Sequence, residues 1–417
     1  MEAMQLTRLV QRLVEEEHGS SSILHLTANE NVLSRLASRF VAGALYGRYH
    51  LGHANKREIE RFATTFSGLI LRSLSSVHEM EQEALRASRV LFGAAYADFR
   101  PLSGVHAIIA TLSALTSPGD TIYCLRPTEA GHFATANIIG RLGRHCSYLP
   151  WNNECSDLDL NQATELFKKV PPNAIYLDHS GSLFPLNIRG LRRLVGKETL
   201  IIYDGSHPMG LIAGRMFKNP LEDGADVLQG STHKTFPGPQ KAIVTMNSYE
   251  LWQRFSRTMD SFVSSQHSGD TMALYLSMLE MEVFASEYAA QVLKNSSALA
   301  RALQERGFRV FSRDGELPVS HQVLLMGFDS GEHLLGAQKL LDCGISVNSK
   351  TALGKSIIRI GVQESTRRGM KEPEMRRIAD LFWDALAGID SAHNIQRKVD
   401  DLLLRHQDIR YSFDNLC

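Results

Sequence analysis

The segment ADVLQGSTHKTFPGPQ, residues 225–240, joins an apolar run to a turn that contains Pro-Gly-Pro. The apolar part predicts a buried strand, and the prolines prevent a helix or a long strand from continuing past Lys234. A lysine at the end of a buried strand is desolvated, which favours the free amine over the ammonium ion. A free amine can form a Schiff base with a carbonyl group, so Lys234 is the first catalytic candidate. The alternative is an ordinary solvated lysine.

Further short apolar runs occur on both sides of this segment, some of them separated by helical stretches. They lie at residues 121–125, 174–178, 199–205 and 242–246. This pattern predicts an α/β protein with a mixed, mostly parallel central sheet covered on both faces. Binding sites in such sheets lie at the carboxyl ends of the strands. Polar side chains gather at these ends, namely Asp178, His179, Asp204, His207, His233 and Lys234.

The periodicity divides the chain into three predicted parts. Residues 1–25 form an N-terminal helical arm, whose apolar residues Leu6, Leu9, Val10 and Leu13 follow helical spacing. We expect this arm to dock on another surface, such as a second subunit. Residues 26–285 form the large domain and residues 286–417 a smaller C-terminal α+β domain.

Several helices are predicted inside these two domains. Helical periodicity covers residues 33–46 and 56–94, and it returns at residues 271–306 and 332–342. A final helix is expected near residues 371–387.

Charge and cysteine content exclude several classes of protein. The 417 residues contain 45 Lys and Arg and 45 Asp and Glu, so no excess of positive charge favours nucleic acid or an acidic membrane. The five cysteines form no C-x-x-C pair, which indicates reduced thiols and argues against a zinc site. No apolar run is long enough to span a bilayer. We therefore expect a soluble cytoplasmic protein with neither a metal nor a membrane as partner.

Asp204 and His207 follow an apolar strand in YDGSHPMG, residues 203–210. A carboxylate facing a pyridine nitrogen would keep that nitrogen protonated and strengthen the ring as an electron sink. At a separation of about 4 Å and an effective dielectric of about 20, the attraction between this carboxylate and the protonated nitrogen is worth roughly 4 kcal/mol. The alternative is that Asp204 caps a helix.

Three more residues are candidates, each with an ordinary structural alternative. Arg359 in SIIRIG, residues 356–361, could clamp a carboxylate, or it could form a structural ion pair. Ser103 in PLSGVHA, residues 101–107, could open a helix that binds a phosphate, or it could simply cap that helix. His132 could stack on a flat ring, or it could be a packed or surface histidine.

The order of these signals, together with longer motifs, resembles the serine hydroxymethyltransferase family of fold-type-I pyridoxal-phosphate enzymes. The similar motifs include LTANEN at residues 26–31, LFGAAYADFRPLSG at 91–104 and STRRG at 365–369. The segment around Lys234 is the most specific of them. The resemblance covers residues 24–390 and implies the α/β fold of those transferases, with pyridoxal 5'-phosphate as cofactor.

The resemblance implies a role for each candidate residue. Lys234 forms the Schiff base with the cofactor, Asp204 pairs with the pyridine nitrogen, and Arg359 binds the substrate carboxylate. Tyr46 acts across a dimer interface, which implies a homodimer or a larger homo-oligomer. Residues 262–269 lie where a neighbouring chain touches the phosphate.

The remaining implied contacts surround the cofactor. Ser103 and Gly104 hold the phosphate, His132 stacks on the ring and His207 lies near the phenolic oxygen. His233 lies beside the imine. Ser231 is also assigned to the cofactor site.

This sequence departs from the family pattern on the substrate side. Arg48 replaces a glutamate that handles protons, and an arginine cannot act as a general base near neutral pH. Asn29 replaces a serine, Val105 a serine near the phosphate, and Gln240 an arginine. Residues 53–76 make this region longer than the family's loop. We assign Asn29, Tyr46 and Arg48 to the substrate site, with Tyr46 and Arg48 also counted as catalytic.

Several departures resemble the threonine transaldolase branch, including THKTFPGPQK at residues 232–241, GVQESTRRGMKE at 361–372 and YSFDN at 411–415. That resemblance implies aldol chemistry at Cα and Cβ of an amino acid without folate, in specialised metabolism. β-Elimination, decarboxylation or deamination, and transamination remain open. A catalytically silent cofactor-binding partner protein is the alternative from another class.

Overall fold

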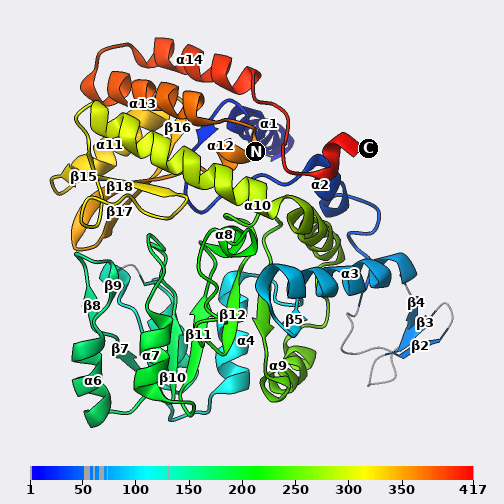
Figure 1. Cartoon of the computed structure of the whole chain (residues 1–417). Coiled ribbons are helices and arrows are strands. Elements are labelled where there is room, and N and C mark those ends of the chain that lie inside the picture. Colours follow the sequence, from blue (N-terminus) through cyan, green and yellow to red (C-terminus); the bar gives the residue numbers. More distant parts are fainter. Residues whose placement is uncertain are drawn as a thin grey trace.

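The computed structural model describes residues 2–50, 57–59, 62–64, 70–72, 74–129 and 131–416. Two sheets, one above the other in Figure 1, organise the chain. The larger sheet lies in the lower half of the view and the smaller one in the upper half.

The larger sheet has seven strands, and all but one run parallel. β13 is antiparallel to both of its neighbours. The sheet is therefore mixed and mostly parallel, and the predicted fold class is confirmed. The strands in spatial order are β5 (Tyr96–Asp98), β13 (Ala242–Met246), β12 (Val227–Ser231), β11 (Leu200–Asp204), β10 (Ala174–Leu177), β6 (Thr121–Cys124) and β7 (His145–Tyr148).

Both faces of this sheet are buried, which explains why its strands read as continuous apolar runs. Alternate residues of one strand enter different clusters: Ile201 and Tyr203 pack on one face, and Ile202 packs on the other. One face is covered by α4 (Gly104–Leu115) and α9 (Tyr249–Phe262). The opposite face is covered by α3 (Ser75–Phe92), α7 (Ile188–Val195), α8 (Met209–Ala213) and α10 (Ser268–Glu305).

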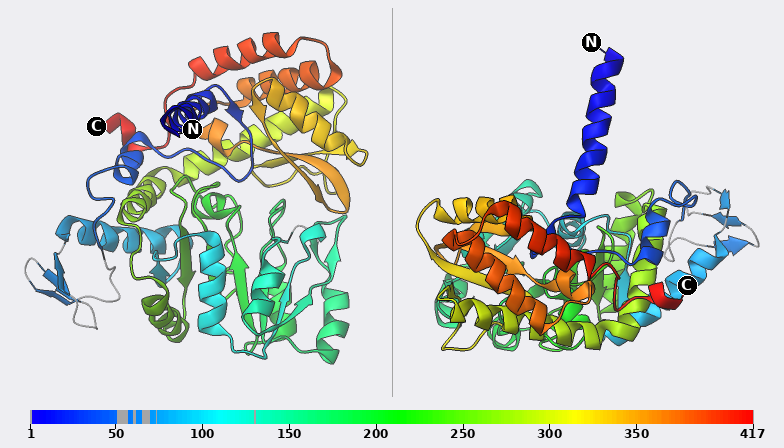
Figure 2. Two further views of the ribbon diagram at one scale, coloured as in Figure 1. Left: turned by 180° about the vertical axis from the view of Figure 1, so that it is seen from behind. Right: turned by 90° about the horizontal axis from the view of Figure 1, so that it is seen from above.

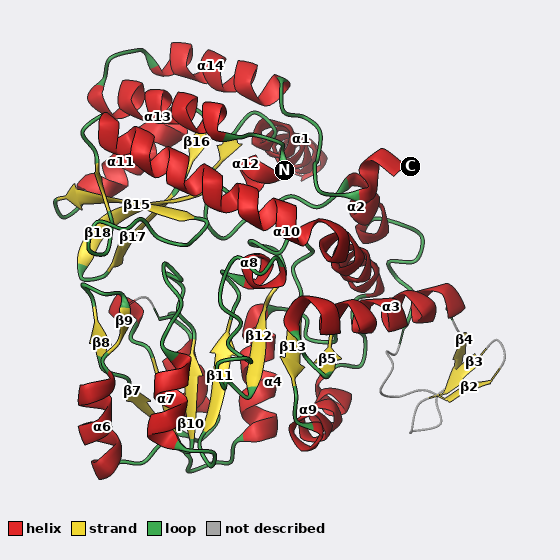
Figure 3. Ribbon diagram, in the orientation of Figure 1, coloured by secondary structure: helices red, strands yellow, loops and turns green. Residues whose placement is uncertain are grey.

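The smaller sheet is antiparallel and carries helices on one side, as Figure 3 shows. Its order is β14 (Arg309–Val310), β15 (Gln322–Phe328), β18 (Lys355–Gly361) and β17 (Asn348–Ala352). The helices are α11 (Glu332–Asp342), α13 (Glu372–Ala387) and α14 (Ala392–Leu404). A short parallel pair joins β1 (Leu24–His25) to β16 (Ile345–Ser346), so the N-terminal segment is attached to this part of the chain.

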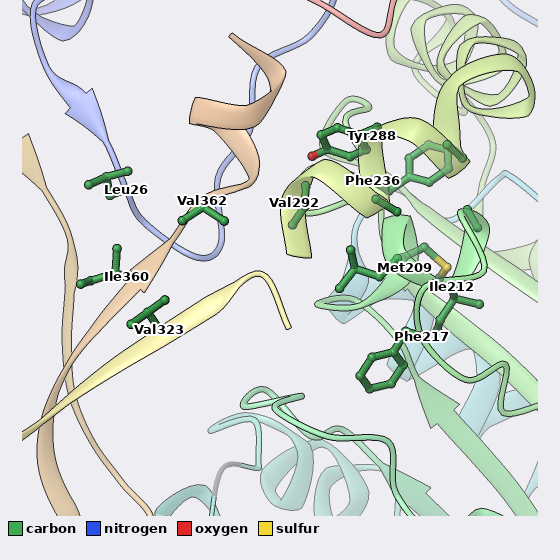
Figure 4. Close-up of a cluster of buried hydrophobic side chains, with 14 of the residues drawn as sticks. Leu26, Met209, Ile212, Phe217, Phe236, Tyr288, Val292, Val323, Ile360 and Val362 are labelled. Carbon is green, nitrogen blue, oxygen red and sulfur yellow. The ribbon is translucent and has the colours of Figure 1, made fainter. Parts of the chain in front are cut away.

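One apolar core connects the two sheets. In Figure 4 Met209 and Phe236 lie on the side of the larger sheet, and Val323 and Ile360 belong to the smaller one. The 38-residue helix α10 packs against α3 and α8 and also against α13. The predicted domain boundary at residues 285 and 286 falls inside this helix and stays a prediction.

The N-terminal helix α1 (Glu2–Ser20) projects away from the rest of the chain in the right-hand view of Figure 2. Its apolar residues Leu6, Leu9 and Leu13 are exposed. Docking of this arm on a second subunit stays a prediction. None of the helices in the described ranges has the length and apolar character needed to cross a membrane.

Two helix predictions are wrong in part. The described residues of 56–74 contain three short strands, β2 (Arg57–Ile59), β3 (Phe62–Thr64) and β4 (Ile70–Arg72), and α3 begins only at Ser75. Aromatic and β-branched residues in this stretch favour strands despite the helical spacing. The other residues of the predicted insertion at 53–76 lie mostly outside the described ranges.

The helix predicted at 33–46 is also shorter than expected. α2 (Arg35–Val41) ends before Gly43, and the residues that follow it form turns. A Cβ at Gly43 would lie 2.6 Å from the Arg39 carbonyl oxygen, so this turn requires glycine.

Further elements complete the fold. α14 and β17, described above, were not predicted. The remaining short elements are α5 (Thr135–Arg141), β8 (Trp151–Asn152), β9 (Asp157–Leu158), α6 (Leu160–Lys169), α12 (Gln363–Arg367) and the 3₁₀ turns at Pro127–Glu129 and Phe413–Leu416.

Candidate active site

A cavity of about 220 Å³ opens at the carboxyl ends of β10, β11 and β12. The structure brings most of the predicted cofactor residues together in its lining. These are Ser103, Gly104, His132, Asp204, His207, Ser231, His233 and Lys234. The location agrees with the rule that parallel sheets bind ligands at this edge.

Lys234 lies in a tight loop directly after β12. The backbone N–H of Gly238 donates to the Thr232 carbonyl at 2.7 Å, which closes the loop. Asn31 Nδ2 donates to the Lys234 carbonyl at 2.5 Å, and the Thr235 hydroxyl donates to the His207 carbonyl. The prolines after Lys234 thus end the strand and leave the lysine at the cavity, which explains why a lysine occurs before Pro-Gly-Pro.

Burial lowers the pKa of Lys234 to about 8. The nearby Asp204 carboxylate raises this pKa, and the Arg359 guanidinium lowers it further. The free amine that a Schiff-base lysine requires is therefore far more abundant near neutral pH than in an ordinary lysine.

Asp204 ends β11 and turns its carboxylate to the cavity. Oδ2 accepts a hydrogen bond from the Tyr176 hydroxyl at 2.9 Å, and Oδ1 accepts one from the Ser206 backbone N–H at 3.0 Å. The next helix, α8, has Pro208 as its N-cap. Asp204 therefore does not cap that helix, and the structural alternative considered for it is wrong.

Four histidines line the same cavity, and three of them, His132, His207 and His233, are predicted site residues. Burial lowers the pKa of each of these three. The value for His233 falls to about 4, with Lys234 as the second cause. Nδ1 of His207 and Nδ1 of His233 are buried and have no hydrogen-bond partner within the described part of the chain. Neutral rings with unused nitrogens can accept a proton or a hydrogen bond from a bound molecule.

Asp178 holds the loop that carries His132. Its Oδ2 accepts hydrogen bonds from the His132 backbone N–H at 3.1 Å and from the Thr135 hydroxyl at 2.5 Å. The pKa of Asp178 is raised to about 7, mainly by burial and in part by the neighbouring Asp204, although the hydrogen bond from Thr135 acts in the opposite direction. Asp178 was expected at a strand end but received no site role. Its position after the apolar run at 174–177 was the available signal.

The other end of the cavity lies at the start of α4. Ser103 caps this helix, since its Oγ accepts from the His106 backbone N–H at 3.1 Å. The N-cap alternative for Ser103 is thus present, and it coexists with a place in the cavity wall. Gly104 faces Ser231. A Cβ added to Gly104 would lie 3.3 Å from the Cβ of Ser231. The buried Ser231 Oγ has no hydrogen-bond partner among the described residues.

Arg359 lies on β18 beyond the lining of this cavity. Its Nη2 donates to Asn348 Oδ1 at 2.8 Å and to Asn29 Oδ1 at 3.2 Å. Burial lowers the pKa of Arg359 to about 10. No carboxylate of the described residues pairs with it, so the structural ion pair considered as its alternative is wrong. Its guanidinium remains available for an anion.

Tyr46 and Arg48 do not line the cavity of their own chain. Both side chains are exposed, Tyr46 by 53%. The segment that carries them packs against residues 262–269: the Ser268 hydroxyl donates to the Arg48 carbonyl, and Gln266 Nε2 donates to the His50 carbonyl at 2.8 Å. Both segments predicted to serve a neighbouring chain therefore form one surface, and their role in a shared site stays a prediction.

Ser180, Ser206 and Lys350 were not predicted. Ser180 and Ser206 line the cavity, and Ser206 Oγ accepts a hydrogen bond from the Ser231 backbone N–H at 2.8 Å. Lys350 lies beside Ser180, with 3.5 Å between Nζ and Oγ. The serines follow apolar strands and could have been found by that position, whereas nothing local to the sequence marks Lys350.

Comparison with known proteins agrees with this arrangement. A family model described as serine hydroxymethyltransferase matches residues 4–382. A fluorothreonine transaldolase of Streptantibioticus cattleyicolor is 37% identical over 99% of this chain, which spans 64% of that relative's length. A serine hydroxymethyltransferase of Archaeoglobus fulgidus is 35% identical over 93% of this chain and 89% of its own.

A solved structure is similar over almost the whole chain. It is an L-threonine transaldolase of Pseudomonas fluorescens in its internal aldimine state, with a TM-score of 0.90 and 27% identity. The alignment covers 99% of this chain and 95% of that one.

Proposed function

The chain belongs to the serine hydroxymethyltransferase family and is an enzyme of the pyridoxal-phosphate type, and we propose that it is a folate-independent transaldolase. In this reaction it removes acetaldehyde from threonine and joins the remaining glycine unit to a second aldehyde. The substrate and the site residues below belong to this proposal.

The cavity offers groups that fit pyridoxal phosphate. The start of α4 and the unpartnered Ser231 hydroxyl suit a phosphate, because helix N-termini and hydroxyl groups bind anions. Asp204 suits a protonated pyridine nitrogen, and Lys234 suits the aldehyde. When bound, the cofactor supplies an electron sink that stabilises negative charge at Cα.

The residues of the chain carry the remaining steps. Arg359 binds the α-carboxylate and thereby orients the amino acid. His233, neutral near pH 7, can accept the proton of the β-hydroxyl through its unused Nδ1 when the Cα–Cβ bond breaks. Lys234 provides the amine that would bind the cofactor aldehyde and be displaced from it by the amino group of the substrate.

One observation favours transaldolase over folate-dependent chemistry. Position 48 carries arginine where the family resemblance places a proton-handling glutamate. A guanidinium stays protonated at physiological pH and cannot act as a base. The similarity to two transaldolases, over 99% of this chain in both cases, supports the same conclusion.

The test is to supply purified holoenzyme with threonine and an aromatic aldehyde, without folate. We expect release of acetaldehyde and formation of a β-hydroxy amino acid. The parallel assay supplies serine and tetrahydrofolate. Turnover of that pair above about 1 s⁻¹, a rate normal for an enzyme, would contradict the proposal.

A further inference from the structure

Lys350 places a second cation next to the candidate active site. Asn348 pairs with Arg359 across the β17–β18 hairpin, and Lys350 lies two residues further along β17. Side chains two residues apart project from the same face of a strand. Lys350 and Arg359 both line a small cavity together with Gly181 and Gln322. Ser180, which lies beside Lys350, lines the main cavity.

The surroundings of Lys350 contain positive or neutral groups. The ammonium helps to lower the pKa of His179, which burial brings to about 3, and it also acts on His132 and His207. Burial, and then the charge of Arg359, lowers the pKa of Lys350 itself to about 8. No carboxylate in the described residues pairs with Lys350. A desolvated cation without a counter-ion is costly, so the arrangement favours a bound anion.

The position of Lys350 is fixed by its supports. Gln322 Nε2 donates to the Gly181 carbonyl at 2.5 Å and joins β15 to the loop after β10. The loop residue Leu183 enters a buried cluster with Leu353 and Ile357 of the hairpin. A hydrogen bond and apolar contacts therefore hold the hairpin against the loop after β10. Lys350 is for this reason fixed in position, unlike a lysine on a free surface.

An α-amino acid brings a single carboxylate, which the proposed function assigns to Arg359. The cofactor phosphate is assigned to the start of α4, at Ser103 and Gly104. Because these two anions already have partners, Lys350 is available for a third anion. The substituent at Cβ, which is exchanged during the reaction, is the part of the substrate that could carry it. Resting on the transaldolase function, we propose that Lys350 is a specificity residue that binds an anionic group, such as a carboxylate, on the acceptor aldehyde.

Kinetics with two acceptors test this assignment. With threonine as donor, KM is measured for 4-formylbenzoate and for uncharged benzaldehyde. We expect Lys350→Met to raise the KM for 4-formylbenzoate about tenfold more than that for benzaldehyde, as expected for loss of a charged hydrogen bond. Lys350→Arg should restore most of the difference. Lys355→Met, an exposed lysine on the same hairpin, is the matched control and should leave the ratio of the two KM values unchanged.

Two outcomes would overturn the proposal. One is an equal change of both KM values in Lys350→Met. The other is a rise in the KM for threonine alone, which would assign Lys350 to the α-carboxylate beside Arg359.

A binding measurement separates this proposal from the transaldolase function. Dissociation constants for 4-carboxyphenylalanine and phenylalanine are taken from the change in visible absorbance of the holoenzyme. We expect wild type to favour the carboxylated ligand and Lys350→Met to lose at least about tenfold of that preference. If no aldehyde yields product, the proposed function fails, and this comparison still decides on Lys350. Equal preference in wild type and variant would refute the role of Lys350.

Discussion

The two walls of the candidate active site hold their charged groups in different ways. On the wall formed by the larger sheet, Asp204 is bonded to Tyr176 and Ser206. On the side formed by the β17–β18 hairpin, the hydrogen bonds of the Arg359 guanidinium within the described residues go to the amides of Asn29 and Asn348, and Lys350 Nζ lies 3.5 Å from the Ser180 hydroxyl. Asp204 thus has hydrogen-bond partners within the protein, whereas no carboxylate of the described residues pairs with Arg359 or Lys350, and we expect these two cations to bind anionic groups of the substrates. We therefore expect the sheet to carry the reacting groups and the hairpin to determine which substrates bind.

The largest expected effect is on the sheet wall. Lys234→Ala should reduce the release of acetaldehyde from threonine by about 10⁴-fold with every acceptor, because the Schiff-base amine is lost. Lys197→Ala, an exposed lysine after α7, is the control and should behave as wild type. Borohydride treatment followed by mass spectrometry should label wild type at residue 234 and leave the variant unlabelled. Retention of a tenth of the activity would contradict the assignment.

A smaller and more selective effect is expected on the hairpin wall. Arg359→Gln should raise the KM for threonine about 100-fold and change kcat much less, because charged hydrogen bonds to the carboxylate are lost. Glutamine keeps a donor for Asn348. Steady-state kinetics over a range of threonine concentrations measure both constants. A loss confined to kcat would place Arg359 outside the substrate site.

The close contact between Gly210 and the backbone of Thr235, next to Lys234, can be tested by a substitution that adds a methyl group. A Cβ at Gly210 would lie well inside van der Waals distance of the Thr235 carbonyl oxygen. Gly210→Ala should therefore lower the free energy of unfolding by about 2 kcal/mol and weaken cofactor uptake. Gly140→Ala, in α5 with open space around its Cα, is the control and should be neutral or slightly stabilising. Urea denaturation gives both values, and equal stability of the two variants would argue against a tight contact.

The smallest effect concerns pH. The neutral amine is the form that reacts, and the pKa of Lys234 is lowered to about 8. The rate at which apoprotein takes up pyridoxal phosphate should therefore rise about fivefold between pH 7 and 8 and level off above about pH 9. Arg359→Gln removes a charge that lowers this pKa, so its midpoint should move to higher pH. A midpoint near the ordinary lysine pKa would show that Lys234 is solvated.

Local sequence predicted the parts of the fold that local pattern determines. The apolar runs at 174–178 and 199–205 became β10 and β11, because a strand buried on both faces needs apolar residues at every position. The residues after these strands, such as Asp204, could be predicted as site candidates since parallel strands end at one edge. The helix expected at 56–94 was wrong in its first part, 56–74, because short stretches of aromatic and β-branched residues can match the spacing of a helix as well as that of a strand.

Contacts between distant segments could not be predicted. SKTALGKS at residues 349–356 resembles a phosphate loop that lacks the first glycine, yet it forms most of β17, the turn after it and the start of β18. The approach of Lys350 to Ser180 spans 170 positions and depends on the packing of Leu183 against that hairpin. Nothing in either segment alone encodes this proximity.

The continuous helix α10 has a mechanical consequence. It packs against the supports of both sheets without a proline or a break along its 38 residues. An unbroken helix resists bending, because a sharp kink needs a defined interruption of its hydrogen bonds. Because α10 packs against elements next to the Lys234 loop and against α13 beside the Arg359 strand, we expect the separation of these two residues to change only if this helix bends or its packing shifts.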